Sequence, residues 1–153
     1  MENWAAELLE ILQKEEALLN SILNKAVLKT DALKTGNVNG IDAIVNHEQP
    51  LVLQVQAAEN KRLALLKKFK LEEFPLSELA VMAGEDYEGC FTQLLSSMND
   101  ICENLKKRNG LNSELTKARL EFYNFLKGSE TLYENDGRKK QSSSKLGLMD
   151  KKM

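Results

Sequence analysis

An apolar repeat that continues without a shift through residues 85–133 restricts what this chain can fold into. Its positions are Tyr87, Phe91, Leu94, Met98, Ile101, Leu105, Arg108, Asn112, Leu115, Arg119, Phe122 and Leu126. Alternating steps of four and three residues place these side chains along one side of a helix that packs in a left-handed coiled coil. Because the repeat crosses Asn109-Gly110 in phase, we expect one helix over residues 85–128, at a cost of about 1 kcal/mol for the glycine relative to alanine. The alternative is a reversing loop at Asn109-Gly110, which would give four helices instead of three.

Two further long helices are predicted upstream. Residues 3–34 carry their apolar residues mostly in adjacent pairs, a stripe wide enough to contact two neighbouring helices. Residues 40–73 keep a single seam that stays in phase across Pro50. A proline removes one backbone hydrogen bond and clashes with the preceding turn, so we expect a kink near Asn46 rather than a break.

Turn and cap residues separate these helices. Gly36 predicts the end of the first helix, and Asn37 and Asn39 are both candidate caps for the second. Residues 76–82 predict a short connecting helix capped by Ser77. Short connections make successive long helices alternate in direction.

The expected fold is therefore all-α: an antiparallel bundle of three long helices, a short connecting helix and a disordered C-terminal tail. The bundle domain spans residues 1–137 with a helical overhang from about residue 115, and residues 138–153 form a flexible basic tail. The predicted core consists of Trp4, Leu8, Ile11, Leu19, Ile22, Ile44, Leu51, Val55, Leu65, Phe69, Phe91, Leu94, Met98, Ile101 and Leu105.

Composition narrows the functional classes. The chain has a net charge of −2, although residues 138–153 are strongly basic, so the remainder is acidic and nucleic acid is not expected as the main partner. No apolar run approaches the roughly 20 residues of a membrane span, and the first residues do not resemble a signal peptide. We therefore expect a cytoplasmic protein, in which Cys90 and Cys102 are reduced and partly buried.

Charged residues interrupt the apolar seams at two heights. Counting helical levels places Arg62 near Glu15 and Glu16, and it places Glu48 near Lys25, Lys29 and Arg108. Paired carboxylates could indicate an active site, but each acid here has a base at its own level. We interpret the two layers as structural features that define the register between helices.

Catalytic and metal-binding constellations are missing from the sequence. Carboxylate metal sites in helical bundles use Glu-x-x-His motifs from two helices, whereas His47 is the only histidine and is followed directly by Glu48. Level counting separates His47 from Cys90 and Cys102, which disfavours a Cys–His pair. No glycine-rich phosphate loop follows a strand. We expect no catalytic residue, metal or cofactor.

The last part of the third long helix extends beyond the predicted bundle and is rich in aromatic residues. Exposed apolar segments of this kind mark partner surfaces. The predicted partner-binding residues are Leu115, Phe122, Tyr123, Phe125, Leu126, Leu132 and Tyr133. The alternative is that this segment folds back onto the bundle as ordinary core.

The order and spacing of several motifs resemble the FlgN family of flagellar export chaperones. These are His47-Glu48-Gln49, Ala58-Glu59-Asn60-Lys61-Arg62-Leu63, Asn109-Gly110-Leu111-Asn112 before Leu115, Leu132-Tyr133-Glu134-Asn135-Asp136-Gly137 and Leu148-Met149-Asp150-Lys151-Lys152. Pro50 departs from the family pattern and leaves the straightness of the second helix open.

The resemblance implies a cytoplasmic chaperone without enzymatic activity. Such proteins bind the C-terminal helical segments of hook–filament junction (hook-associated) proteins and help deliver them to the export gate of the flagellar type III apparatus. The resemblance also suggests that Tyr133 faces the export gate rather than the cargo. The alternative function is a helical scaffold or adaptor that self-associates, for example as a homodimer, through the same C-terminal segment.

Overall fold

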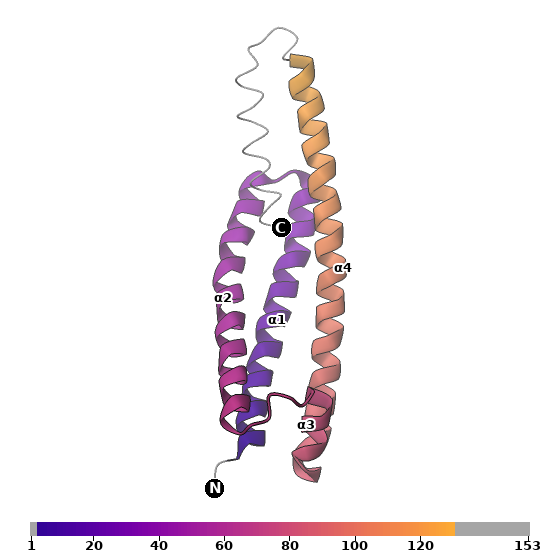
Figure 1. The fold of residues 1–153 in the computed structure, drawn as a ribbon. Coiled ribbons are helices and arrows are strands. Elements are labelled where there is room, and N and C mark those ends of the chain that lie inside the picture. The colour runs from indigo at the N-terminus through magenta and orange to yellow at the C-terminus, as the bar shows by residue number, and fades with distance from the viewer. Residues whose placement is uncertain (1–2, 131–153) are drawn as a thin grey trace. The chain divides into compact units, whose positions relative to one another are not determined.

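The computed structural model describes residues 3–130, except for the side chains of Tyr123, Ser129 and Glu130. This range contains four helices and no strand: α1 (Trp4–Thr35), α2 (Val38–Lys68), α3 (Leu76–Met82) and α4 (Glu85–Glu130) (Figure 1). The predicted all-α class is confirmed. The predicted continuity of the last helix through Gly110 is also confirmed, and the alternative of a reversing loop at Asn109-Gly110 is wrong.

Both ends of α1 and the start of α2 lie where their cap residues indicate. Asn3 Oδ1 accepts hydrogen bonds from the backbone N–H groups of Ala5 at 3.1 Å and Ala6 at 3.3 Å, which caps α1. Gly36, at φ 72°, follows the last residue of α1, as predicted. Asn37 caps α2, because its Oδ1 accepts from the Gly40 N–H at 3.0 Å.

The end of α2 differs from the prediction, since the helix stops at Lys68 instead of residue 73. Lys70 adopts φ 57°, a left-handed conformation that is unfavourable for a residue with a Cβ atom. The turn closes through a hydrogen bond from Leu71 N to Leu66 O at 2.7 Å, and Leu71 is buried in the apolar core. Burial of Leu71 compensates for the backbone conformation of Lys70, as the apolar contact of a Schellman-type helix end does.

The predicted cap of α3 was also wrong. Pro75 occupies the N-cap position and provides no side-chain hydrogen bond, so Ser77 lies inside the helix. The carbonyl of Pro75 accepts from Glu78 N at 3.0 Å and Leu79 N at 3.1 Å. Proline suits this position because it has no N–H group that would need a partner.

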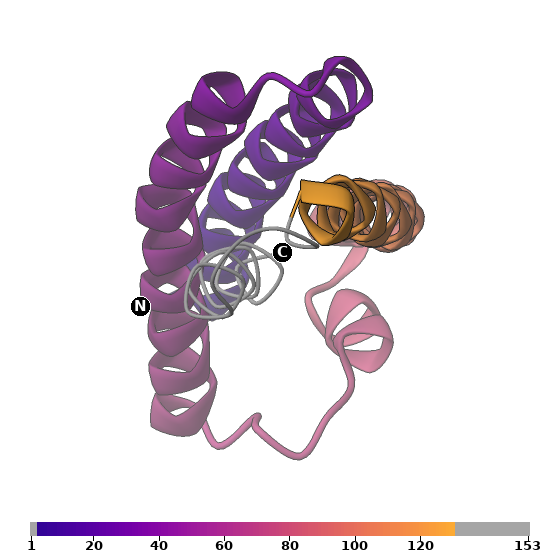
Figure 2. The same ribbon diagram turned by 90° about the horizontal axis from the view of Figure 1, so that it is seen from above.

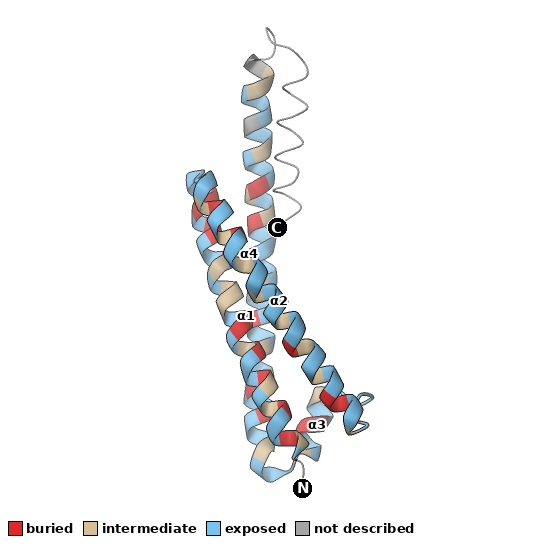
Figure 3. Ribbon diagram, turned by 90° about the vertical axis from the view of Figure 1, so that its left-hand side faces the viewer, coloured by how far each residue is buried: buried red, intermediate tan, exposed pale blue. Residues whose placement is uncertain are grey.

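The chain divides into two compact units, and α1, α2 and α4 each contribute to both. Unit 1 comprises residues 1–24 and 47–105. Its core is a cluster in which α3 packs against the three long helices (Figure 3). The buried members are Ala5, Leu8, Leu12, Leu65, Leu66, Leu71, Leu79, Ala80, Phe91 and Leu94.

Unit 2 comprises residues 25–46 and 106–153, of which the structure describes the part up to residue 130. The chain reverses at Gly36-Asn37, and a smaller buried cluster joins the two arms of this hairpin through Ala32, Leu33, Ile41 and Val45. Within this unit α4 runs beside the end of α1 (Figure 2). Contacts from Asn112 to Ala26 and from Arg119 to Leu33 show that these parts of α1 and α4 run in the same direction.

The predicted core residues lie inside the protein to different degrees. Five are buried, namely Leu8, Leu65, Phe91, Leu94 and Ile101, and the other ten are partly buried. Left-handed coiled-coil packing of all three long helices stays a prediction. The predicted tail, residues 138–153, and its boundary at residue 137 lie outside the described residues.

Candidate partner-binding segment of α4

The candidate site is the part of α4 that follows Arg119. Phe122 is 58% exposed, Phe125 71% and Leu126 45%. Their spacing of three and four residues places them on one side of the helix. Large apolar side chains exposed together on a helix indicate a surface that a partner covers.

The preceding turns of α4 are held in unit 2 by both apolar and polar contacts. Leu115 is partly buried and packs against the cluster of Ala32, Leu33, Ile41 and Val45. The side of α4 that carries Leu115 also carries Phe122 and Leu126, because these positions continue one seam. The packed part of the seam therefore runs directly into the exposed part.

Asn112 is the centre of a buried polar network in the same unit and is only 1% exposed. Its Nδ2 donates to the Ala26 carbonyl at 2.9 Å, and its Oδ1 accepts from the Thr30 hydroxyl at 2.5 Å. Arg108 donates to the same hydroxyl oxygen at 3.4 Å. A buried polar residue at a seam position defines the register of α4 against α1, because another register would leave these groups without partners.

Arg119 contacts the end of α1. Its Nε donates to the Leu33 carbonyl at 2.9 Å, and its Nη2 donates to the Lys34 carbonyl. The repeat in the sequence includes Arg119, but no role was predicted for this residue. The signal that could have identified this role is a basic residue about one turn beyond the predicted level of the first helix end.

The structure brings four of the predicted partner-binding residues together on α4: Leu115, Phe122, Phe125 and Leu126. Tyr123 lies in the same helical segment, and its side chain is not described. Leu132 and Tyr133 lie outside the described residues. Sequence reasoning omitted Leu111, an α4 residue that is 38% exposed.

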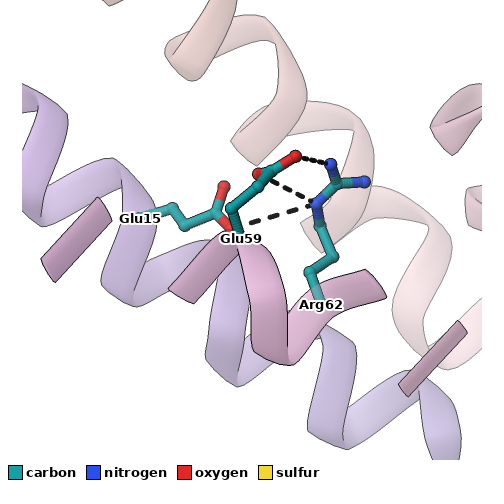
Figure 4. Close-up of polar contacts among 3 residues, drawn as sticks. All are labelled: Glu15, Glu59 and Arg62. Carbon is teal, nitrogen blue, oxygen red and sulfur yellow. Dashed lines mark hydrogen bonds and ion pairs between the residues drawn. The ribbon is translucent and has the colours of Figure 1, made fainter. Parts of the chain in front are cut away.

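One of the two predicted charged layers is confirmed, in unit 1 (Figure 4). Arg62 Nε lies 3.9 Å from Glu15 Oε1, and it donates to Glu59 Oε2 at 3.3 Å. Glu15 is 5% exposed, and its Oε1 has no hydrogen-bond partner. Burial and the nearby charge of Glu59 raise the pKa of Glu15 above its ordinary value of 4.5, and Arg62 partly opposes this. The second layer, which joins Glu48 to Lys25, Lys29 or Arg108, stays a prediction.

The residues considered for catalysis or metal binding are His47, Cys90 and Cys102. Among the described residues no group of three or more His, Cys, Asp or Glu side chains could hold a metal ion. His47 is exposed. Cys90 and Cys102 are free and exposed, so the expectation of partly buried thiols was wrong. Both lie on the outside of α4, whose buried side is occupied by seam residues such as Phe91, Leu94 and Ile101.

Hydropathy adds one negative finding. None of the described helices has an apolar stretch of the length and composition that a membrane span requires.

Comparison with known proteins identifies the family. The model of the FlgN protein family matches residues 1–141. A relative from Bacillus subtilis (strain 168), named "Uncharacterized protein YvyG", is 28% identical over 121 residues, which cover 77% of this chain and 75% of the relative. No solved structure matches the chain. The family match extends across all four helices and past the exposed aromatic segment of α4, and the chain therefore belongs to the FlgN family of flagellar export chaperones.

Proposed function

We propose that this protein is a cytoplasmic chaperone that binds the C-terminal helical segments of hook–filament junction proteins through the exposed part of α4. The family match supports a role as a flagellar export chaperone. The observation that carries the finer assignment is the exposure of Phe122, Phe125 and Leu126 directly after a packed stretch of the same helix.

A helical client suits this surface on physical grounds. At Leu115 the α4 seam packs on apolar side chains of α1 and α2, whereas at Phe122 and Leu126 the side chains of the same seam are exposed. An amphipathic helix from a client can continue the packing, as in helix-in-groove recognition. Exposed phenylalanines are suited to this role because aromatic anchors dominate binding energies at protein interfaces.

The chaperone then helps to deliver its client to the export gate of the flagellar type III apparatus. We assign Leu132 and Tyr133 to the partner surface as well, with Tyr133 directed to the gate rather than to the client. This assignment rests on the family resemblance of the segment from Leu132 to Gly137. The proposed role involves no catalytic step, metal or cofactor.

The test is a binding titration on the double variant Phe122→Ala/Phe125→Ala. The probe is a synthetic peptide that covers the C-terminal helical segment of a hook–filament junction protein from the same organism. We expect the double variant to bind at least tenfold more weakly, about 1.4 kcal/mol. Its thermal midpoint should stay nearly unchanged, because both side chains are exposed in the folded protein.

Phe74→Ala is the matched control. Phe74 is 40% exposed but lies in unit 1, far along the chain from α4 residues 122–126. It should bind the peptide as the wild type does. If the double variant loses several kcal/mol of stability while each folded molecule binds normally, the aromatic segment is core and the proposal is wrong.

Self-association through the same segment is the competing function, and the mass of the protein distinguishes it. A scaffold that buries two copies of Phe122 and Phe125 against each other would show a concentration-dependent mass in sedimentation equilibrium. A chaperone would be monomeric in the same range and form a stoichiometric complex with the peptide.

A further inference from the structure

The C-terminal end of α1 is capped by two different parts of the chain. A helix leaves its last carbonyls without partners inside the helix. Here the turn itself supplies Asn37 N to Ala32 O at 2.9 Å and Gly36 N to Leu33 O at 3.4 Å. The guanidinium of Arg119 adds hydrogen bonds to the carbonyls of Leu33 and Lys34 from a position 85–86 residues further along the chain.

The guanidinium also lies directly against the turn. A Cβ atom at Gly36 would come within 3.0 Å of Arg119 Nη1 and 3.2 Å of its Cζ. Gly36 therefore serves two purposes, since it adopts φ 72° and leaves room for the arginine. The positive charge of Arg119 is favourable beside the negative end of the α1 dipole.

Backbone carbonyls at a helix end are stiffer partners than a flexible side chain. An arginine whose planar guanidinium donates to two such carbonyls therefore restrains the direction of its own helix. Along α4 the burial of the side chains changes at Arg119. Asn112 and Thr116 before it are buried, whereas Phe122 and Phe125 after it are exposed. The arginine thus stands at the base of the segment that continues beyond the α1–α2 turn.

We propose that Arg119 is a positioning residue for client binding: by clamping α4 to the end of α1, it directs Phe122 and Phe125 toward the client. This inference rests on the function proposed above. It assigns Arg119 no contact with the client, and the effect on binding acts entirely through the direction of the aromatic segment.

The first test needs no client. Leu28→Cys in α1 and Glu121→Cys in α4 provide two exposed attachment points for spin labels. The native thiols are removed first by Cys90→Ser and Cys102→Ser, so that only the introduced cysteines are labelled. Arg119→Ala should broaden the distance distribution between the labels measured by electron–electron double resonance, and Lys117→Ala should leave it unchanged. An unchanged distribution in Arg119→Ala would overturn the proposal. Arg119→Lys keeps the charge without the fork and should also broaden it; this variant decides the question should Arg119→Ala fail to fold.

The second test is a double-mutant cycle on binding of the junction-protein peptide. Arg119→Ala alone should weaken binding about fivefold, because the segment must be ordered when the client binds. In the Phe122→Ala/Phe125→Ala background the same change should have almost no effect, since the residues that it positions are gone. An equal fivefold loss in both backgrounds would mean that Arg119 acts independently of the aromatic residues, which contradicts the proposal.

The two tests separate this inference from the function on which it rests. If the wild-type protein does not bind the peptide, the proposed function fails, and the distance measurement still shows whether Arg119 clamps α4. If the peptide binds and the distance distribution ignores Arg119, only the positioning role fails.

Discussion

Replacing Arg62 by methionine tests the charged layer of unit 1. The substitution keeps much of the apolar side-chain volume but removes the cation that faces Glu15 and Glu59. Glu15 is 5% exposed and cannot recover its lost partner from bulk water without rearrangement. Two carboxylates then face each other across the α1–α2 contact, and the free energy of unfolding must fall.

The structure sets the expected size of this loss. Breaking a fully buried ion pair costs about 3–5 kcal/mol, whereas exposed pairs contribute about 0–1 kcal/mol. The side chain of Arg62 is 18% exposed and that of Glu59 is 44% exposed, so water screens one of the two contacts. The Arg62–Glu15 distance of 3.9 Å is also long for a strong pair. We therefore expect Arg62→Met to lose about 2–3 kcal/mol at neutral pH.

The loss should depend on pH in a defined direction. The pKa of Glu15 in the folded protein is raised above its ordinary value of 4.5, mainly by burial and then by Glu59. A group with a raised folded pKa contributes stability below the unfolded pKa, and this contribution disappears as the pH rises through the folded pKa. The charge of Arg62 lowers the pKa of Glu15, so its removal raises that pKa further. The stability that Arg62→Met loses relative to the wild type should therefore become smaller as the pH falls from neutral toward 4.5, the ordinary pKa of Glu15.

Urea unfolding followed by circular dichroism measures the effect, because the slope of the transition reports whether the exposed surface has changed. Lys61→Met is the control, since Lys61 is an exposed neighbour on the same helix. The double variant Glu15→Gln/Arg62→Met should recover most of the lost stability because the amide carries no charge. Surface substitutions typically change the free energy of unfolding by less than about 0.5 kcal/mol. A loss of that size in Arg62→Met, or a loss that does not change with pH, would refute the reasoning.

Two further predictions concern the middle of α4. Gly110→Ala should raise the free energy of unfolding by up to about 1 kcal/mol, because the new Cβ atom would point into open space and alanine is the better helix former. A destabilised variant in the same urea assay would show that the glycine has a conformational role. Asn112→Ala should lose about 2–3 kcal/mol of unfolding free energy, because it removes the buried hydrogen bonds of Asn112 with the Thr30 hydroxyl and the Ala26 carbonyl and leaves a gap beside Ala26. The exposed Asn109→Ala is its control, and equal effects of the two variants would rule out the buried network as a source of stability.

The length and position of the helices could be predicted because they depend on patterns that lie close together in the sequence. The seam stays in phase through Gly110, and α4 is continuous there. Asn37 and Gly36 are local signals for a helix start and a helix end, and both act as expected. The end of α2 was misplaced because Lys70 carries no such signal. Its left-handed conformation is stabilised by burial of Leu71, which depends on packing against other helices.

The candidate site was predictable to the same extent. The exposed positions Phe122 and Leu126 follow from the seam and from counting how far the upstream helices reach. The pairing of Arg62 with Glu15 also followed from counting levels, while the stronger contact of Arg62 with Glu59 on its own helix was not foreseen. Side-chain rotamers decide which of several acids within reach a guanidinium binds, and the sequence does not specify them.

The sequence by itself determined the helical class, the continuity of α4 and the aromatic character of its far end, since hydrophobic periodicity and cap residues act over a few turns. Only the tertiary structure showed that Arg119 caps α1, that Asn112 bonds to Ala26 and Thr30, and that Leu71 closes the end of α2. The Arg119 and Asn112 contacts join residues more than 80 positions apart and depend on the axial register of one helix against another to within a single residue. A repeating seam allows several such registers, and the fit of individual side chains to buried carbonyls and hydroxyls selects one of them.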